Sequence, residues 1–266
     1  MEFLDISIKS EVSQLLNTQL FSGRFSDNEI YELLDECVSI SDLNSVYQNL
    51  LQEKSHLKNL GIDLPLWFGD FNSANKTMVV ALDPKRNKQE NKEISVGSIF
   101  SLHTEEGKKT NKNDYWSFIS YLSQTDFVYL TDIYKIYYET KDKNGQNIVS
   151  NKDKDFIDNA CYQHNKSILD DEINKIVKPN RIITLGNDAA NAVKRIKDIK
   201  TNEIQFRLNE IDYLLLPHIS RTVTQSIKTI GNLYKGLGIV TQKEEITKIG
   251  NSILNHSELK QILTKT

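Results

Sequence analysis

The sequence predicts an α/β fold: a three-layer α/β/α sandwich on a central four-stranded parallel sheet, with extra helices at the N-terminus. Four short runs of apolar and β-branched residues predict buried strands. Amphipathic stretches lie between these runs, and such alternation is typical of a parallel sheet with helices on both faces. At 266 residues, 38% of them hydrophobic, the chain is long enough for one large domain. We therefore expect residues 1–266 to form a single domain.

The N-terminal residues have helical spacing. Apolar residues of SEVSQLLNTQLF recur at helical intervals, SDNEIYELLDEC begins with a capping signature, and a third helical stretch ends before Gly61. We expect residues 1–60 to form a helical extension packed on the domain. Residues 250–266 predict a C-terminal helix.

Strands and helices alternate from residue 77 onward. The predicted strands are TMVVAL, DFVYLTDIY, RIITLG and IDYLLLPH, at residues 77–82, 126–134, 181–186 and 211–218. Helices are expected near 113–123, 153–177 and 188–197, and an exposed loop at 141–155. In such folds ligands gather beyond the carboxyl ends of the strands.

Composition restricts the function. No apolar run is long enough to span a membrane, and the acidic N-terminus is unlike a signal peptide, so we expect a cytoplasmic protein. Two cysteines, Cys37 and Cys161, cannot supply the four thiolates of an iron–sulfur cluster, and we expect no metal or other cofactor. A net charge of -3 means that any DNA-binding surface must be a local cluster of cations. The runs 84–92 and 105–113 are candidates, although Lys-rich loops are also commonly just solvated.

Residues with useful chemistry follow the predicted strands. Asp83-Pro84 follow the first strand, Asp132 ends the second, Gly186-Asn187-Asp188 follow the third, and His218 ends the fourth. Hydrolysis at an anomeric carbon needs a carboxylate that orients water or stabilises a cation, and a histidine that supports a leaving anion. Alternatively, Asp83 and Asp188 cap helices and His218 is a hydrogen-bonded core residue.

These segments resemble the motifs of the uracil-DNA glycosylase superfamily. Asp83-Pro84 after an apolar strand is similar to the Gly-Gln-Asp-Pro-Tyr-His motif, and His218-Ile219-Ser220 is similar to the His-Pro-Ser motif. VYLTDIYK at 128–135 resembles the strand that ends in a base-reading asparagine, and RIITLGNDAANAV at 181–193 resembles the third strand, glycine turn and helix. The likeness spans about residues 65–240 in the right order.

The resemblance implies a role for each matching residue. Asp83 would position the hydrolytic water and stabilise the sugar oxocarbenium ion, and His218 would hydrogen-bond the departing base at O2. Ser220 would hold a phosphate beside the flipped nucleotide, Arg221 would lie near the wedge in the vacated stack, and Phe100 is a candidate platform under the base. Further candidate DNA contacts are Arg86 and Lys88 in the cationic run.

Three positions depart from the family pattern. Lys85 replaces a tyrosine that blocks substituents at the pyrimidine C5, so it would leave room for such a substituent. Asp132 replaces the pyrimidine-reading asparagine, and an ionised carboxylate accepts from the cytosine amino group but repels uracil O4. Ile219 replaces a proline and changes the loop. If the strand aligns one residue earlier, Thr131 is the reader instead.

We therefore expect a monofunctional DNA glycosylase, acting as a monomer, that removes a C5-modified cytosine. Superfamily members that defend against bacteriophages remove glucosylated hydroxymethylcytosine from phage DNA, and the chain resembles these. The alternatives are a repair glycosylase for uracil or damaged pyrimidines, a catalytically silent domain that binds nucleic acid or a partner, and a nucleoside hydrolase. A lysine nucleophile is disfavoured because Lys85 and Lys135 show no apolar setting of the kind that activates one.

Overall fold

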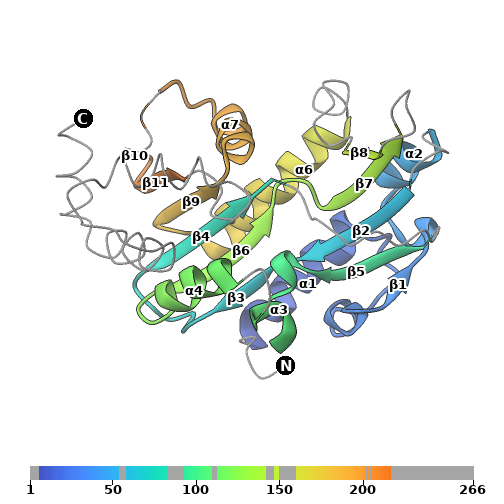
Figure 1. The fold of residues 1–266 in the computed structure, drawn as a ribbon, viewed down its shortest axis with the longest axis horizontal. Coiled ribbons are helices and arrows are strands. Elements are labelled where there is room, and N and C mark those ends of the chain that lie inside the picture. Colours follow the sequence, from blue (N-terminus) through green and yellow to red (C-terminus); the bar gives the residue numbers. More distant parts are fainter. Residues whose placement is uncertain are drawn as a thin grey trace. The chain divides into compact units, whose positions relative to one another are not determined.

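The chain divides into two compact units, each made of three separate segments. The computed structural model describes residues 6–53, 58–82, 93–109, 113–141, 147–149, 160–201, 203 and 205–216 (Figure 1). The first unit comprises Met1–Leu66, Leu82–Ser101 and Thr131–Lys178. The second comprises Trp67–Ala81, Leu102–Leu130 and Pro179–Thr266.

The first unit contains a five-stranded mixed sheet in the order β1-β5-β2-β7-β8. Its strands are β1 Cys37–Val38, β2 Lys58–Leu64, β5 Ile94–Ser98, β7 Ile136–Lys141 and β8 Asn147–Val149. β2 and β5 are parallel, whereas the other neighbouring pairs are antiparallel.

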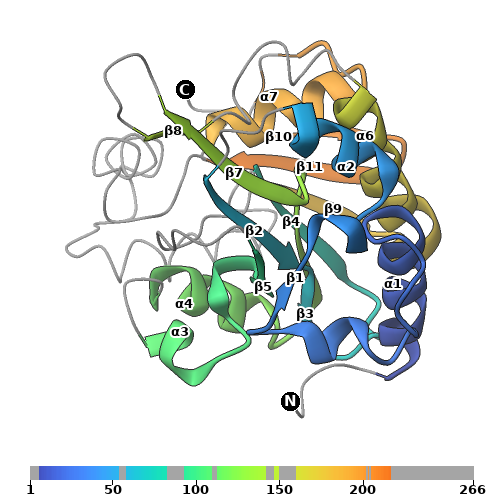
Figure 2. The ribbon, with the colours of Figure 1, turned by 90° about the vertical axis from the view of Figure 1, so that its right-hand side faces the viewer.

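Among the described residues, three α-helices accompany this sheet. They are α1 Ile6–Gln19, α2 Ser45–Glu53 and α6 Ala160–Asp171, which continues as the π-helix η5 Glu172–Val177. Shorter 3₁₀ turns are η1 Ile30–Leu33, η2 Ile40–Asp42 and η3 Ile99–Ser101. Both α1 and α2 pack against α6, and α1 also contacts η5 (Figure 2).

A six-stranded sheet in the order β10-β11-β9-β4-β6-β3 belongs to the second unit, except that Leu66, Thr131 and Asp132 at strand ends fall in the first unit. Its strands are β3 Leu66–Phe68, β4 Lys76–Ala81, β6 Phe127–Asp132, β9 Arg181–Leu185, β10 Gln205–Leu208 and β11 Ile211–Leu216. β4, β9 and β11 are parallel neighbours, and β10 is antiparallel to β11. The helices are α3 Glu105–Lys109, α4 Asn113–Leu122 and α7 Asn187–Ile196, of which α7 packs on β9 and β11.

The predicted α/β class is confirmed, and each of the four predicted strands is present as β4, β6, β9 and β11. The sheet that holds them is larger than expected, with six strands and an antiparallel pair. The three-layer arrangement and the single domain stay predictions. The predicted C-terminal helix at 250–266 lies outside the described residues.

The prediction of helix throughout residues 1–60 is wrong. Residues 37–38 and 58–64 form β1 and β2. In β2 the apolar residues Leu60, Ile62 and Leu64 alternate at the strand period, and all three are buried. Their partners lie in β5 and β7, far along the chain, so pairing decided the structure over local helical spacing. The prediction of a loop at 141–155 is also wrong in part, because residues 147–149 form β8.

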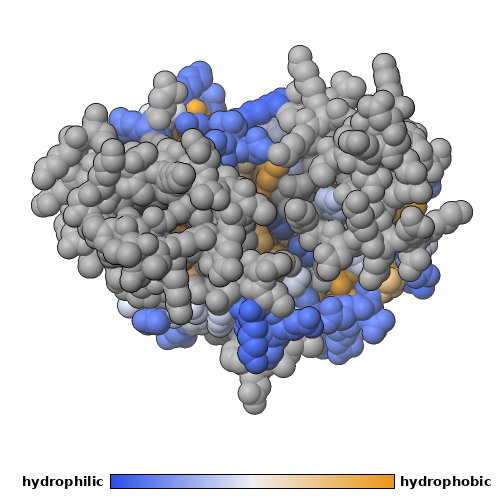
Figure 3. All heavy atoms as spheres, viewed as in Figure 1, coloured by the Kyte–Doolittle hydropathy of each residue, from blue (hydrophilic) through white to orange (hydrophobic). Residues whose placement is uncertain are grey.

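The second unit has an aromatic core beside a buried ionic cluster. Trp67 stacks on Tyr129 with ring centroids 6.1 Å apart. Near the amino ends of β4 and β9, Asp126 accepts hydrogen bonds from the Thr77 hydroxyl at 2.6 Å and the Arg181 guanidinium at 3.0 Å. We call Thr77, Asp126 and Arg181 the amino-end cluster. The Trp67 and Tyr129 side chains are buried, and the coloured surface in Figure 3 is mainly hydrophilic.

Replacing Gly69 by alanine is expected to destabilise the second unit. Gly69 has φ +87, and an added Cβ would lie 2.3 Å from the Asp126 carbonyl oxygen, which belongs to the backbone. Strain and overlap together should lower the free energy of unfolding by about 2 kcal/mol or more.

Urea unfolding followed by circular dichroism measures this loss. The matched control is Gly23→Ala, because Gly23 has φ +78 but open space around the added Cβ. It should cost only the backbone strain, about 1 kcal/mol. Equal losses in the two variants would show that the overlap at Gly69 is relieved without cost.

Candidate functional site

The strand order of the second sheet changes direction between β4 and β9. Within this sheet, the strand that follows β4 in sequence is β6, on one side, and the strands that follow β9 lie on the other side. The neighbouring parallel strands β4 and β9 therefore send the chain in opposite directions, which defines a topological switch point. Ligands of open α/β sheets bind outside the carboxyl ends of the strands at such a point.

The strand register aligns the chain exits at this edge. Val80 of β4 and Leu215 of β11 both pair with Thr184 of β9. The predicted catalytic residue Asp83 lies three residues after Val80 in the sequence. The other, His218, lies three residues after Leu215. Both lie outside the described residues, but the strands that lead to them end level with one another.

Two backbone hydrogen bonds hold the last described residues before these positions. Within the first unit, the Tyr134 amide donates to the carbonyl of Leu82, the residue bonded to Asp83, at 2.9 Å. Within the second unit, the Gly186 amide donates to the Leu216 carbonyl at 2.8 Å. Gly186 is the N-cap residue immediately before α7 and has φ +102, so this turn requires glycine.

Asp132, the predicted base reader, is the last residue of β6 and is 3% exposed. Its neighbour Thr131 is 1% exposed. Successive side chains of a strand point to opposite faces, so the side chains of Thr131 and Asp132 lie in different surroundings. The Thr131 hydroxyl donates to the carboxylate of Glu172 at 3.0 Å and accepts from the Lys135 ammonium. Thr131 therefore belongs to an ionic network.

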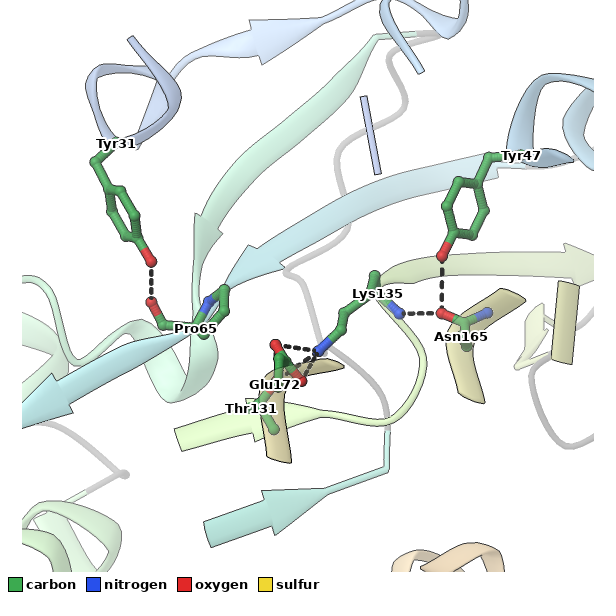
Figure 4. A network of polar contacts seen from close by, with 7 residues as sticks. All are labelled: Tyr31, Tyr47, Pro65, Thr131, Lys135, Asn165 and Glu172. Atoms are coloured by element: carbon green, nitrogen blue, oxygen red, sulfur yellow. Dashed lines mark hydrogen bonds and ion pairs between the residues drawn. The ribbon is translucent and has the colours of Figure 1, made fainter. Parts of the chain in front are cut away.

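A buried ion pair is the centre of this network (Figure 4). The Lys135 ammonium lies 2.9 Å from a carboxylate oxygen of Glu172, and their side chains are 1% and 0% exposed. The sequence indicates no apolar setting for Lys135, and the structure buries it beside a carboxylate. Its charge, however, is matched by Glu172, so the arrangement is that of a fixed cation.

A second set of hydrogen bonds fixes the backbone of the same turn. The Lys135 amide donates to the Asn165 side-chain carbonyl at 3.1 Å, and the Tyr47 hydroxyl donates to the same oxygen at 2.9 Å. Thus Asn165 of α6 anchors the turn that follows β6, and Tyr47 of α2 holds Asn165 in place (Figure 4).

Tyr31 is a further buried polar group near the ion pair. Its hydroxyl donates to the Pro65 carbonyl at 2.8 Å (Figure 4). Burial raises the pKa of Tyr31 well above its usual range, and the negative charge of Glu172 raises it further. Tyr31 therefore stays a neutral hydrogen-bond donor.

Phe100, the predicted base platform, has an unusual backbone. It has φ +56, and the next residue, Ser101, has φ +55. Left-handed conformations are costly for a bulky residue and tend to persist at functional sites, where the surroundings impose them. The Phe100 side chain is half-buried, which leaves part of it accessible.

The described residues do not include the four predicted DNA contacts, Arg86, Lys88, Ser220 and Arg221. They do not include Lys85, predicted for base recognition, either. In the other cationic run, Lys108 is mostly buried, and its ammonium binds Glu105 at 2.8 Å and lies 4.9 Å from the Trp116 ring centroid. Lys108 therefore takes part in packing between α3 and α4 rather than in an open cationic surface.

No family model matches the chain, and no curated protein matches it.

The residues that the structure describes hold no group of three or more His, Cys, Asp or Glu side chains arranged to bind a metal ion. Among them, no helix combines the length and apolar character needed to cross a membrane.

Sequence reasoning missed Glu172 and Asn165. A usable signal existed for Glu172, because it lies four residues after Ile168 and four before Ile176, on the apolar side of a helical pattern. A charged residue at such a position predicts a buried partner. For Asn165 the same pattern gives no comparable signal.

Proposed function

We propose that the chain is a DNA glycosylase that flips out a C5-modified cytosine and hydrolyses its N-glycosidic bond. The observation that carries the proposal is the strand register. Val80 and Leu215 both pair with Thr184, and Asp83 and His218 lie three residues after them in the sequence. The switch point between β4 and β9 supports the same edge as the binding edge.

The proposed reaction needs two groups from this edge. Water adds to the anomeric carbon while the bond to the base breaks, and the base leaves with the bonding electrons. Asp83 orients the water, accepts its proton and stabilises the positive charge on the sugar. His218 hydrogen-bonds O2 of the departing base, where the negative charge develops.

Asp132 is the proposed base reader. The engagement of Thr131 by Glu172 and Lys135 supports this choice over the alternative register. A carboxylate at this place accepts a hydrogen bond from the cytosine amino group and disfavours uracil. Lys85, in place of a blocking tyrosine, gives room and a donor to a C5 substituent. The strained, half-buried Phe100 supports a stacking platform under the base.

The test is release of bases from a panel of duplexes. Purified protein is incubated with DNA that carries uracil, cytosine, 5-hydroxymethylcytosine or glucosylated 5-hydroxymethylcytosine, and abasic sites are cleaved with alkali. We expect cleavage only at C5-modified cytosine. Cleavage at uracil alone would make the protein a repair glycosylase, and no cleavage anywhere would favour a silent binding domain.

Replacing Asp132 by asparagine is expected to move the preference toward uracil. The asparagine amide can donate to uracil O4, which the carboxylate repels. We expect the ratio of excision rates, modified cytosine over uracil, to fall by about 100-fold or more. The control is Asp63→Asn, at a buried aspartate of β2 in the same unit. An unchanged ratio in Asp132→Asn would remove Asp132 from base reading.

A further inference from the structure

Thr131, Lys135 and Glu172 form a network, and its members Thr131 and Lys135 flank the proposed base reader Asp132 in the sequence. Thr131, immediately before Asp132, is bound through its hydroxyl. Lys135, three residues after it, is bound through both its ammonium and its backbone amide. Between them, the Tyr134 amide is bound to the Leu82 carbonyl. The backbone is therefore fixed on both sides of Asp132.

Stability alone gives no reason for an ion pair at this place. Removing two charges from water costs much of what their attraction returns, and well-packed apolar residues often replace a buried pair without loss of stability. A buried pair does impose one geometry, because each hydrogen bond must be satisfied.

The local backbone shows how the carboxylate reaches the turn. Glu172 is the first residue of the π-helix η5, where α6 changes its winding. Such turns are rare in proteins and frequent at functional sites. From this position the Glu172 carboxylate binds the ammonium of Lys135 and the hydroxyl of Thr131 together.

We propose that Thr131, Lys135 and Glu172 form a positioning network that sets the orientation of Asp132 and thereby the selectivity for cytosine over uracil. Thr131 and Asp132 point to opposite faces of β6, so holding one fixes the direction of the other. The network touches no substrate itself. This inference rests on the proposed function, because it assigns a role to the base reader of that site.

The test replaces the whole network by apolar residues of similar size. The variant Thr131→Val/Lys135→Met/Glu172→Leu leaves no uncompensated charge from the ion pair. The matched control is Thr77→Val/Asp126→Leu/Arg181→Met, which removes the amino-end cluster with the same kinds of side chain. Each protein is assayed for excision of C5-modified cytosine and of uracil, and its melting temperature is measured.

A positioning role predicts a change in selectivity that a loss of stability does not produce. The ratio of excision rates should fall about tenfold or more in the network variant, through slower removal of modified cytosine and faster removal of uracil. The control should keep the wild-type ratio, whatever its melting temperature. Thr131→Val is the milder second variant if the triple variant does not fold, and it should lower the ratio in the same direction while Thr131→Ser restores it.

The outcomes separate this inference from the proposed function. An active wild-type protein whose ratio survives both the triple variant and Thr131→Val would overturn the positioning role and leave the glycosylase proposal intact. An equal fall in the amino-end control would also overturn it, since the effect would then be general. A wild-type protein that excises no base would overturn the proposed function and, with it, the role of the network.

Discussion

Replacing Asp83 by asparagine is expected to slow base release by about a thousandfold while the protein stays folded. The amide cannot take the proton of the attacking water and carries no charge to stabilise the sugar cation. The residue before it, Leu82, is held by the Tyr134 amide through backbone atoms, and this bond does not depend on the side chain at 83. Single-turnover release of C5-modified cytosine, read as alkali-labile sites, measures the effect.

The control is Asp198→Asn. Asp198 has a side chain that is 85% exposed and a backbone φ of +49, which asparagine tolerates well. This variant should keep the wild-type rate. If Asp83→Asn retains more than a tenth of the wild-type rate, the carboxylate at 83 does not perform the proposed chemistry.

Replacing Lys135 alone by methionine is expected to lower the free energy of unfolding by about 3–5 kcal/mol. The change keeps most of the length of the side chain but removes the cation from a carboxylate that is 0% exposed. Glu172 must then lose its charge or draw in water. The single change should therefore be much more harmful than replacing the whole network.

Urea unfolding followed by circular dichroism measures the loss. On the same helical segment, Lys175 binds Asp171 at 2.8 Å, but the Lys175 side chain is 73% exposed. Lys175→Met should cost less than about 1 kcal/mol because solvent screens that pair. Similar losses in the two variants would mean that burial of the Lys135–Glu172 pair adds nothing to its strength.

The sequence predicted the strands of the second unit better than those of the first. β4, β6, β9 and β11 are dense apolar runs, and their burial is a local property of composition. β2 and β5 each contain a glycine and polar residues, and both become strands through pairing with segments elsewhere in the chain. Local patterns do not contain that information.

The candidate site was predictable in the same uneven way. The chain positions of Asp132 and of the strand ends follow from apolar runs and their termination. The role of Thr131 does not, because it depends on Glu172, 41 residues away. The left-handed backbone at Phe100 is equally hidden, since phenylalanine rarely adopts it and the surrounding fold must impose it.

The interleaving of the two units has a consequence for synthesis of the protein. The chain passes from one unit to the other five times, and one passage, at Leu130–Thr131, falls inside β6. The first unit therefore cannot be completed on the ribosome until Lys178 has emerged, when most of the chain has been made. Its contacts close long loops, which slows folding. Neither unit exists as a contiguous stretch that could be expressed alone, so any shortened version would have to keep both.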